Sequence, residues 1–446
     1  MTRAWFGRLT DAPATFILAG ARVIDPSDGT DAVRDLAVRD GMIVDALPDG
    51  TERIHGRGLV VTPGFCDLHT HLREPGGGSA ETIESGARAA ARGGFTTVCA
   101  MPNTDPPLDD AAAVADASGR SGSAACRVRV IGTATRGRAG RTVGDLVGMA
   151  GAGAIGFSDD GNAVPSGDLV RGILRALAPL GLPLIEHAED TMLAGGGVMR
   201  AGVIATRLGL VGWPPPAEVE VVERDIPLAA ETGARLHLTH LSTAASLEAV
   251  RRAKARGHHV TCEVTPHHLA LTDAWVAGSR RFAWEEPELT DGLAYDGRCR
   301  VNPPLASRDD ALALMAGIAD GTVDAIATDH APHPPERKLV PFDEAAPGLI
   351  GLETALSLGL AAVAAGRLDL PALVAALSSR PAAIIGEERT LRAGAPADLA
   401  VFDPDARWRV DASVLASASA NTPLLGMELP GVVRLTVSDG RLTYRS

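Results

Sequence analysis

Short apolar stretches alternate with alanine-rich stretches along the sequence from Pro63 onward. The apolar stretches are rich in β-branched residues, which predicts strands, and the alanine-rich stretches between them predict helices. Strands are expected at 64–71, 95–103, 127–135, 154–160, 182–187, 235–240, 259–265 and 323–329. Helices are expected near 81–93, 108–120, 144–151, 167–179, 217–233, 244–256, 308–320 and 351–366. Eight strand–helix units in series predict a closed parallel (β/α)8 barrel of the TIM type, an α/β fold.

The two ends of the chain do not follow this alternation. Residues 15–62 show short alternating strands separated by turns such as Asp25-Pro-Ser-Asp-Gly29, and residues 392–446 return to strands and turns. The chain has 446 residues, and a barrel of about 250 residues leaves room for a second, smaller domain. We therefore predict a barrel over 63–391 and a small composite β-sandwich domain built from 1–62 and 392–446.

Two connections within the expected barrel, 191–216 and 273–303, are longer than usual. Long loops on a barrel commonly cover the active site. We expect these two segments to lie near the functional end of the barrel.

Composition limits the partners and the compartment. The net charge of -13, with no basic run, argues against nucleic acid and anionic membrane as partners but allows a small anionic substrate. The first residues lack the apolar core of a signal peptide, and no apolar run approaches the length of a membrane span. Five cysteines at wide spacing fit reduced thiols, with Cys66 and Cys99 buried in strands. We expect a cytoplasmic protein.

Metal-binding residue types gather where the expected strands end, which is where such barrels place their active sites. His69 and His71 are two residues apart at the end of one strand, so their side chains point to the same face. Further strands end in Asp159-Asp160, His187, His240 and Asp329. Because neighbouring strand residues face opposite ways, only one of Asp159 and Asp160 can join the site.

Each of these residues alone has an ordinary explanation, since a single histidine at a strand end is usually a satisfied polar residue and Asp329 could cap a helix. Five coincidences at one end of a barrel are improbable, and the set together favours a metal site. Other histidines keep the ordinary interpretation: His237 is expected to face away from the site, and His267 and His268 to support it structurally. Imidazole and carboxylate ligands without a thiolate suit Zn²⁺ with an open position.

Such a site lowers the pKa of a bound water and polarises a carbonyl group. Asp329, a carboxylate at the edge of the metal site, can take the proton from that water and pass it to a leaving nitrogen. The predicted reaction class is metal-assisted hydrolysis, or its reverse, at an amide-like carbon.

A series of motifs resembles the cyclic amidohydrolase branch of the metal-dependent amidohydrolase superfamily, and within it the bacterial dihydroorotases. The resemblance runs from about Leu59 to Leu356 without a break in motif order. The most specific motifs are Met101-Pro-Asn-Thr104, Asn302-Pro-Pro-Leu305 and Thr328-Asp-His-Ala-Pro-His333. The resemblance implies reversible cyclisation of N-carbamoyl-L-aspartate to L-dihydroorotate in pyrimidine synthesis, with one or two zinc ions.

The resemblance also implies a role for individual residues. His69 and His71 would bind one zinc, His187 and His240 the second, and Asp160, directly before a glycine, would bridge them. Asp329 would be both ligand and general acid/base. The implied substrate residues are His71, Arg73, Asn103, Asn302, His333, Pro347 and Gly348. A guanidinium fork such as that of Arg73 suits a carboxylate.

The small number of lysines distinguishes between the lysine-bridged and aspartate-bridged types of cyclic amidohydrolase. Hydantoinases, allantoinases and some dihydroorotases bridge their metals with a carbamylated lysine on the fourth strand. The only lysines here are Lys254 and Lys338, both outside that strand, so the aspartate-bridged dihydroorotase type is favoured. The chain departs from the family pattern at Ala306, where an arginine is usual, in its longer 273–303 loop, and in the shortened segment Ala346-Pro-Gly348.

Two alternatives stay open at this level. One is a cyclic amide hydrolase acting on hydantoins or allantoin, which would need a lysine bridge and no Arg73. The other is an inactive homologue that serves as a structural partner of aspartate transcarbamoylase, although such homologues typically lose metal ligands and this chain retains them. We expect a homo-oligomer, with aspartate transcarbamoylase as a candidate partner.

Overall fold

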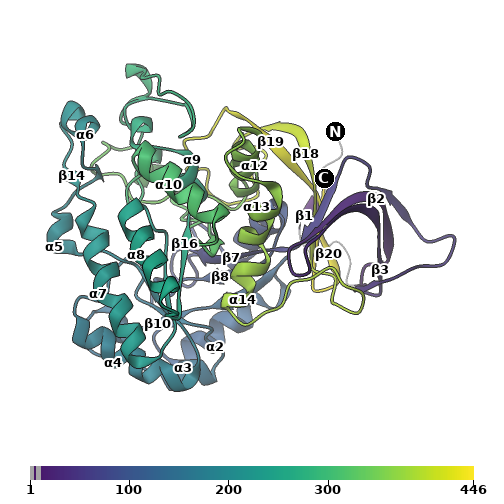
Figure 1. The fold of residues 1–446 in the computed structure, drawn as a ribbon, viewed down its shortest axis with the longest axis horizontal. Coiled ribbons are helices and arrows are strands. Elements are labelled where there is room, and N and C mark those ends of the chain that lie inside the picture. Colours follow the sequence, from purple (N-terminus) through teal and green to yellow (C-terminus); the bar gives the residue numbers. More distant parts are fainter. Residues whose placement is uncertain (1–4, 7–11) are drawn as a thin grey trace.

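The computed structural model describes residues 5–6 and 12–446, so part of the stretch from which we expect no signal peptide lies outside the described residues. Eight parallel strand segments surround the barrel axis within residues 12–446, and all eight predicted strands are present (Figure 1). They are β7 (Phe65–Thr70), β8 (Phe95–Ala100), β9 (Arg127–Val130) continuing into β10 (Gly132–Thr133), β11 (Phe157–Ser158), β12 (Leu184–Glu186), β15 (Leu236–Leu238), β16 (Val260–Val264) and β17 (Ala325–Ile326).

Hydrogen bonds between neighbouring strands close the barrel. β7, β8 and β9 pair in parallel, and β10, β11, β12, β15, β16 and β17 form a second parallel run. The two runs join where Ile131 N–H donates to the carbonyl of Ala100 at 3.1 Å. On the other side, Thr70 forms a parallel bridge with His330, and His71 N–H donates to the carbonyl of His330 at 2.9 Å. The fold is therefore the predicted TIM-like barrel.

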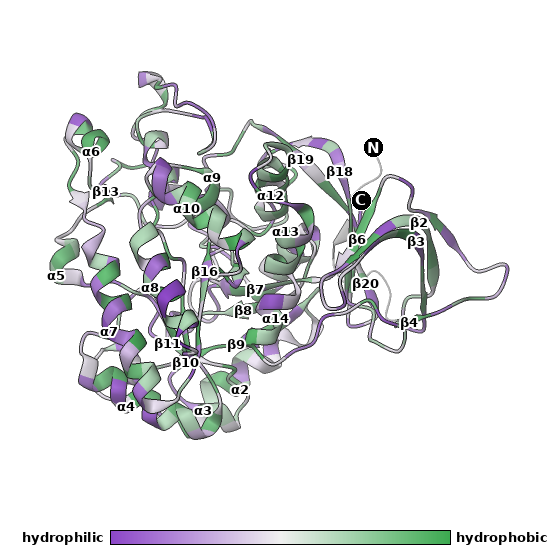
Figure 2. Ribbon diagram, viewed as in Figure 1, coloured by the Kyte–Doolittle hydropathy of each residue, from purple (hydrophilic) through white to green (hydrophobic). Residues whose placement is uncertain are grey.

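Helices follow the strands and cover the outside of the barrel. The predicted helices are found as α1 (Ile83–Gly93), α2 (Ala111–Arg120), α3 (Leu146–Gly151), α4 (Gly167–Leu177), α7 (Pro216–Thr232), α8 (Ala244–Ala255), α10 (Arg308–Ala319) and α12 (Ala355–Ala364). Hydroxyl side chains accept backbone N–H groups at several of their first turns, as N-caps do; these residues are Thr82, Ser166, Thr243 and Ser307. Helices α4 and α7 alternate hydrophilic and hydrophobic stretches, whereas α12 is mostly hydrophobic (Figure 2).

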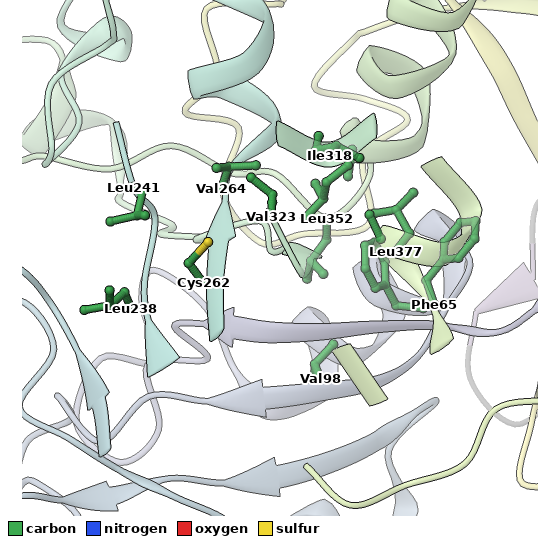
Figure 3. Packing of buried hydrophobic residues seen from close by; sticks show 14 of the residues in the cluster. Phe65, Val98, Leu238, Leu241, Cys262, Val264, Ile318, Val323, Leu352 and Leu377 are labelled. Carbon is green, nitrogen blue, oxygen red and sulfur yellow. The ribbon is translucent and has the colours of Figure 1, made fainter. Parts of the chain in front are cut away.

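Two further helices, α13 (Leu370–Leu377) and α14 (Ser379–Ile384), follow α12 and were not predicted individually. They pack under the barrel against β7 and β17. Leu377 and Phe65 lie together in the packed interior, and Val264, Val323 and Ile318 lie nearby (Figure 3).

All five cysteines are free and buried, which confirms the expectation for Cys66 and Cys99. Phe65 and Phe95, on adjacent strands, meet edge to face with ring centroids 5.6 Å apart, a favoured aromatic geometry. The described helices include none long and apolar enough to cross a membrane.

Strands from both ends of the chain share one nine-stranded sheet in the described part of the molecule, beside the barrel (Figure 1). Its strands are β1 (Trp5–Phe6), β2 (Phe16–Asp25), β3 (Thr30–Arg39), β4 (Met42–Val44), β5 (Arg53–His55), β6 (Val60–Pro63), β18 (Leu399–Arg409), β19 (Glu428–Ser438) and β20 (Arg441–Arg445). The two ends meet where β6 and β18 pair antiparallel. Among the short strands predicted over 15–62, the first is a long strand, β2, with a bulge between Leu18 and Ala21, where Gly20 adopts φ 69° and donates its N–H to Asp35. The exact domain limits stay a prediction.

The two long connections lie next to each other. Segment 191–216 contains α5 (Thr191–Ala194), β13 (Met199–Arg200), α6 (Val203–Leu208) and β14 (Gly212–Trp213), and segment 273–303 contains only short 3-10 turns among its described elements. The Tyr295 hydroxyl donates to the carbonyl of Leu208 at 2.9 Å and ties the two segments together.

Candidate active site

Side chains that follow five barrel strands converge at the carboxyl end of the barrel. Two groups of three ligand atoms, each within 4.8 Å of one another, belong to His69, His71 and Asp160 and to Asp160, His187 and His240. Asp329 Oδ1 lies 3.0 Å from His71 Nε2 and 3.5 Å from His69 Nε2. The structure thus brings together all six residues that the strand ends singled out.

Asp160 is shared by the two groups. Its Oδ1 lies 3.3 to 3.6 Å from one ring nitrogen each of His69, His187 and His240. The neighbouring Asp159 points the other way and accepts a hydrogen bond from the backbone N–H of Thr135 at 2.9 Å. Of the two aspartates that the strand pattern left open, Asp160 is therefore the one that faces the cluster.

The donor atoms fit a metal ion. His69 Nε2 and Asp160 Oδ1 are buried 3.3 Å apart, yet neither has a hydrogen-bond partner among the described residues. An ion with ligand bonds of about 2.1 Å holds neighbouring donors about 3.4 Å apart in a tetrahedron. The observed separations match that spacing, and the unpartnered atoms are accounted for if they bind a cation.

Both carboxylates of the cluster are held in the ionised form that metal binding needs. Burial acts to raise the pKa of Asp160 and Asp329, but the charge of His69 and hydrogen bonds from the surrounding imidazoles outweigh it and lower both. The backbone is strained at this end of the barrel, where Arg73, His240 and Asp329 adopt φ of 60°, 33° and 46°. Strain of this kind clusters at functional sites, where the surrounding structure fixes side-chain direction.

Two glutamates, the buried Glu263 and the partly buried Glu189, orient the histidine rings, and the sequence interpretation gave neither a role. Glu263, on β16, accepts from His69 Nδ1–H at 3.0 Å and from His237 at 3.0 Å. Glu189 accepts from His187 Nε2–H at 3.1 Å. Such carboxylates fix which ring nitrogen faces the metal. The sequence held two signals for these roles. Glu263 is a glutamate within an apolar strand, and Glu189 lies two residues after the ligand histidine His187.

The prediction that His237 faces away from the site is wrong. It lies inside the barrel on β15, and Glu263 connects it to His69. Burial opposes ionisation of Glu263, but hydrogen bonds from His237 and His69 lower the pKa of this carboxyl to about 2. The expectation rested on strand alternation, which puts residues three apart, such as His237 and His240, on opposite faces. It failed because β15 ends at Leu238, so the alternation does not extend to His240.

His267 and His268 lie at α9 (Pro266–Ala270), directly after β16. His268 is satisfied by Thr265 at 2.9 Å and by the carbonyl of Pro303 at 2.9 Å. Neither ring nitrogen of His267 has a partner within the described part of the chain, and burial lowers the pKa of this imidazole to about 4. Both rings are thus neutral, buried groups beside the cluster.

A cavity of about 200 Å³ opens onto the cluster. Its walls include all the residues that were expected to hold substrate, namely His71, Arg73, Asn103, Asn302, His333, Pro347 and Gly348. Asn103 Oδ1 accepts from His71 Nδ1–H at 2.8 Å, and Asn302 donates to Glu189 at 2.8 Å. Ala306, the departure from the family pattern, is buried beside Ala283 and Ala311 and is not part of the wall.

Arg73 is the cation that faces this cavity from β7's end. Its Nε donates to the carbonyl of Pro332 at 3.2 Å, and one terminal nitrogen lies 3.4 Å from His333 Nε2. In the described residues it forms no ion pair with a carboxylate. A partly buried guanidinium without a carboxylate partner favours an anionic group in the cavity.

Comparisons with known proteins agree with this geometry. A family model described as dihydro-orotase-like matches residues 58–246, and a model of the amidohydrolase family matches 351–444. A dihydroorotase of Geobacter sp. (strain M21) is 44% identical over 437 residues, covering 96% of this chain and 99% of the relative. A dihydroorotase of Anaeromyxobacter dehalogenans (strain 2CP-C) is 46% identical over 434 residues, covering 96% and 97%. The chain belongs to the dihydroorotase family.

Solved structures place the dihydroorotase-family fold among the cyclic amide hydrolases. L-hydantoinase from Arthrobacter aurescens matches with a TM-score of 0.82 and 26% identity, over 96% of this chain and 95% of that chain. D-hydantoinase from Thermus sp. matches with a TM-score of 0.77 and 24% identity, over 96% and 94%, which indicates the shared fold. The chain is therefore a metal-dependent cyclic amide hydrolase with a TIM-like barrel and a terminal β-sandwich domain.

Proposed function

We propose that this protein is a zinc-dependent dihydroorotase that interconverts N-carbamoyl-L-aspartate and L-dihydroorotate in pyrimidine synthesis. The observation that carries the proposal is the placement of Arg73 in the wall of a cavity whose floor is the His/Asp cluster. L-Dihydroorotate is a small cyclic amide that bears a carboxylate. The cavity offers a guanidinium for that carboxylate and a metal cluster for the amide.

The metal assignment follows the two ligand groups. His69 and His71 would hold one zinc and His187 and His240 the second, with Asp160 between them and Asp329 at the edge. Nitrogen and oxygen donors without a thiolate suit zinc. When bound, zinc supplies a Lewis acid for the amide carbonyl and lowers the pKa of water.

The remaining residues would bind and orient the ring. Arg73 would pair with the substrate carboxylate, while Asn103, Asn302 and His333 contribute polar atoms around the cavity. Burial, followed by the charge of Arg73, lowers the pKa of His333 to about 3, so this side chain is neutral at physiological pH. The backbone at Pro347 and Gly348 would cover the ring and exclude water.

Asp329 would move the proton. In hydrolysis it takes the proton from the attacking water and delivers it to the ring nitrogen as the carbon–nitrogen bond breaks. In synthesis the same carboxyl accepts the proton of the carbamoyl nitrogen as that bond forms and passes it to the hydroxyl that departs from the substrate carboxyl group, which leaves as water. Its position between the cluster and the cavity supports both directions.

The lysines argue against a hydantoinase-type bridge. Lys254 Nζ donates to Asp324 at 2.6 Å and to the carbonyl of Thr322 at 2.8 Å. Lys338 Nζ donates to three backbone carbonyls outside the cluster. Asp160 occupies the place between the two ligand groups that a carbamylated lysine would need.

The test is hydrolysis of L-dihydroorotate by the purified, zinc-loaded protein, with hydantoin and allantoin assayed in parallel. Turnover of dihydroorotate alone is the expected result. Turnover of hydantoin instead would show that the carboxylate role of Arg73 is wrong. Absence of any turnover in protein that retains zinc would indicate that activity needs a partner subunit or that the altered cover loop prevents closure, whereas poor zinc retention without turnover would favour the scaffold alternative.

Assembly and compartment are part of the proposal. An exposed apolar surface on the two long connections, formed by Val203, Val211, Leu293 and Tyr295, supports association. We propose that copies of this chain form a homo-oligomer in the cytoplasm, with aspartate transcarbamoylase as the alternative occupant of that surface. Light scattering of the protein alone and with the transcarbamoylase distinguishes the two, and Val203→Asp should weaken whichever contact exists.

A further inference from the structure

Lys338 is a buried cation behind the cavity wall, bonded to the backbone of lining residues, and the reaction described above does not use it. Lys338 is the last residue of the short helix α11 (Pro335–Lys338), and only 3% of its surface is exposed. Its Nζ donates to the carbonyl of Arg300 at 3.1 Å, of Ala346 at 2.6 Å and of Gly348 at 2.8 Å. An ammonium group has three donors, and all three are engaged with backbone.

These carbonyls belong to two segments that both contribute residues to the cavity lining. Ala346 and Gly348 flank Pro347 in the expected cover, and Arg300 lies two residues before Asn302. Gly348 N–H also donates to the carbonyl of Arg300 at 2.9 Å. Lys338 therefore cross-links the cover segment to the segment that carries Asn302.

Carbonyl groups of the cover segment also accept hydrogen bonds from side chains other than Lys338. The carbonyl of Pro347 accepts from His333 Nε2–H at 2.8 Å, and that of Gly348 accepts a second hydrogen bond from Asn421 at 3.2 Å. The cover is thus a fixed wall whose separation from Asn302 depends on Lys338.

Stability alone does not account for a cation at this place. Moving an ammonium group out of water costs free energy, and an apolar side chain of similar length would avoid this desolvation cost. Burial lowers the pKa of Lys338 to about 7, which reflects this unfavourable term. Its hydrogen bonds go to the wall of the substrate cavity, so its effect is expected there.

We propose that Lys338 is a positioning residue that sets the spacing between the Pro347–Gly348 cover and Asn302, and thereby the fit of the substrate ring. This inference rests on the proposed function, since the ring is that of dihydroorotate. Loss of the three hydrogen bonds should let the wall move away from the ring. A displacement of about 1 Å at a substrate contact can lower the rate about 100-fold.

The experiment compares Lys338→Met with wild type and with Lys254→Met as a matched control. Lys254 is the other lysine of the chain, and its Nζ contacts lie at Thr322 and Asp324, away from the cavity. Steady-state kinetics with L-dihydroorotate, bound zinc and thermal unfolding are measured for each protein. Lys338→Gln, which keeps two N–H donors, is included as the conservative variant.

The expected result is a KM raised about 10- to 100-fold in Lys338→Met, an intermediate KM in Lys338→Gln, and a wild-type KM in Lys254→Met. The zinc content should stay at the wild-type level in all of them. An unchanged KM in Lys338→Met, or a lower melting temperature and zinc content with no change in KM for either variant, would overturn the proposal. If Lys338→Met does not fold, Lys338→Gln decides on the same KM criterion.

The outcome is separable from that of the proposed function. Wild-type activity on dihydroorotate tests the function, whereas the ratio of variant to wild-type KM tests the positioning role. Were wild type to act on hydantoin instead, the same ratio would be measured with hydantoin, because that ring would meet the same wall.

Discussion

The barrel has a polar cavity near each end, and the two differ in how their charges are satisfied. At the amino end of β9, where the barrel meets the terminal sheet, a cavity of about 680 Å³ is lined by Arg127, Arg129, Arg389 and Arg392. At the carboxyl end, the cavity over the His/Asp cluster has only about 200 Å³. By size alone, the arginine-lined cavity would be taken for the binding site.

Carboxylates of the protein itself neutralise most of the larger cavity. Arg127 pairs with Asp398 at 2.5 Å, Arg129 with Glu387 at 2.5 Å, and Arg389 with Glu387 at 2.6 Å. In the smaller cavity, ring nitrogens and carboxylate oxygens converge on one another, and two atoms at the centre of the cluster, His69 Nε2 and Asp160 Oδ1, have no hydrogen-bond partner among the described residues. Charged side chains that pair with other side chains of the protein hold two parts of a fold together. Polar side chains that converge on one point and lack hydrogen-bond partners there indicate a ligand site.

The largest expected effect concerns the proton carrier of the small cavity. Asp329→Asn should retain the fold and lower kcat for L-dihydroorotate about 10²- to 10⁴-fold, because an amide cannot exchange the proton. Steady-state kinetics and circular dichroism measure the two properties. Substantial residual turnover would refute the role given to Asp329.

Arg73→Met should act through the substrate carboxylate. Loss of a charged hydrogen-bonding pair of about 1.5–3 kcal/mol corresponds to a KM about 10- to 150-fold higher. The same variant is assayed with hydantoin, a ring that lacks the carboxylate. An equal effect on both compounds would show that Arg73 does not recognise the carboxylate.

Glu263→Gln tests the difference between the two cavities directly. Glu263 orients His69, so its loss should weaken zinc binding about 10- to 100-fold in a chelator competition. Glu387→Gln, the same change in the arginine-lined cavity, should leave zinc affinity at the wild-type value. Similar zinc affinities for both variants would contradict the conclusion that only the smaller cavity binds metal.

His333 should make the stability of the metal-free protein depend on pH. Burial and the charge of Arg73 lower the pKa of His333 to about 3 in the folded state, against about 6.5 when unfolded. Below pH 6.5 the unfolded chain binds a proton that the folded chain does not, so stability falls as pH falls from 6.5 towards 3. The slope contributed is at most about 1.4 kcal/mol per pH unit. Urea unfolding at pH 7, 6 and 5 should show a shallower decline for His333→Gln, and parallel curves would contradict the assignment.

The smallest effect is expected in the arginine-lined cavity. The side chain of Arg129 is 41% exposed beside Glu387, and exposed ion pairs contribute less than about 1 kcal/mol. Arg129→Gln should therefore lower the free energy of unfolding only slightly and leave kcat/KM unchanged. A large loss of activity would mean that this cavity takes part in function.

Much of the site was predictable because it follows from periodicity. Alternating strands and helices fix the barrel, and a parallel barrel brings strand ends together, so His69, His187 and Asp329 had to meet. Strand alternation failed beyond the last paired residue, as His237 shows, because the backbone turns sharply where the strand ends. The role of Glu263 was missed because a hydrogen bond between β7 and β16 has no signature in local sequence. Glu189 lies only two residues after His187, and this local signal was not used.

The sequence by itself determined the fold class, the ligand types and the absence of a bridging lysine, since these depend on residue identity and spacing. Strand alternation left Asp159 and Asp160 open, the family resemblance favoured Asp160, and the tertiary structure shows that Asp160 faces the cluster. Only the tertiary structure decided that Glu263 connects His237 to His69 and that Lys338 holds the cavity wall. Those facts depend on side-chain direction at strand ends and on contacts between residues far apart in the chain. Packing of the whole barrel sets both, and no local pattern encodes them.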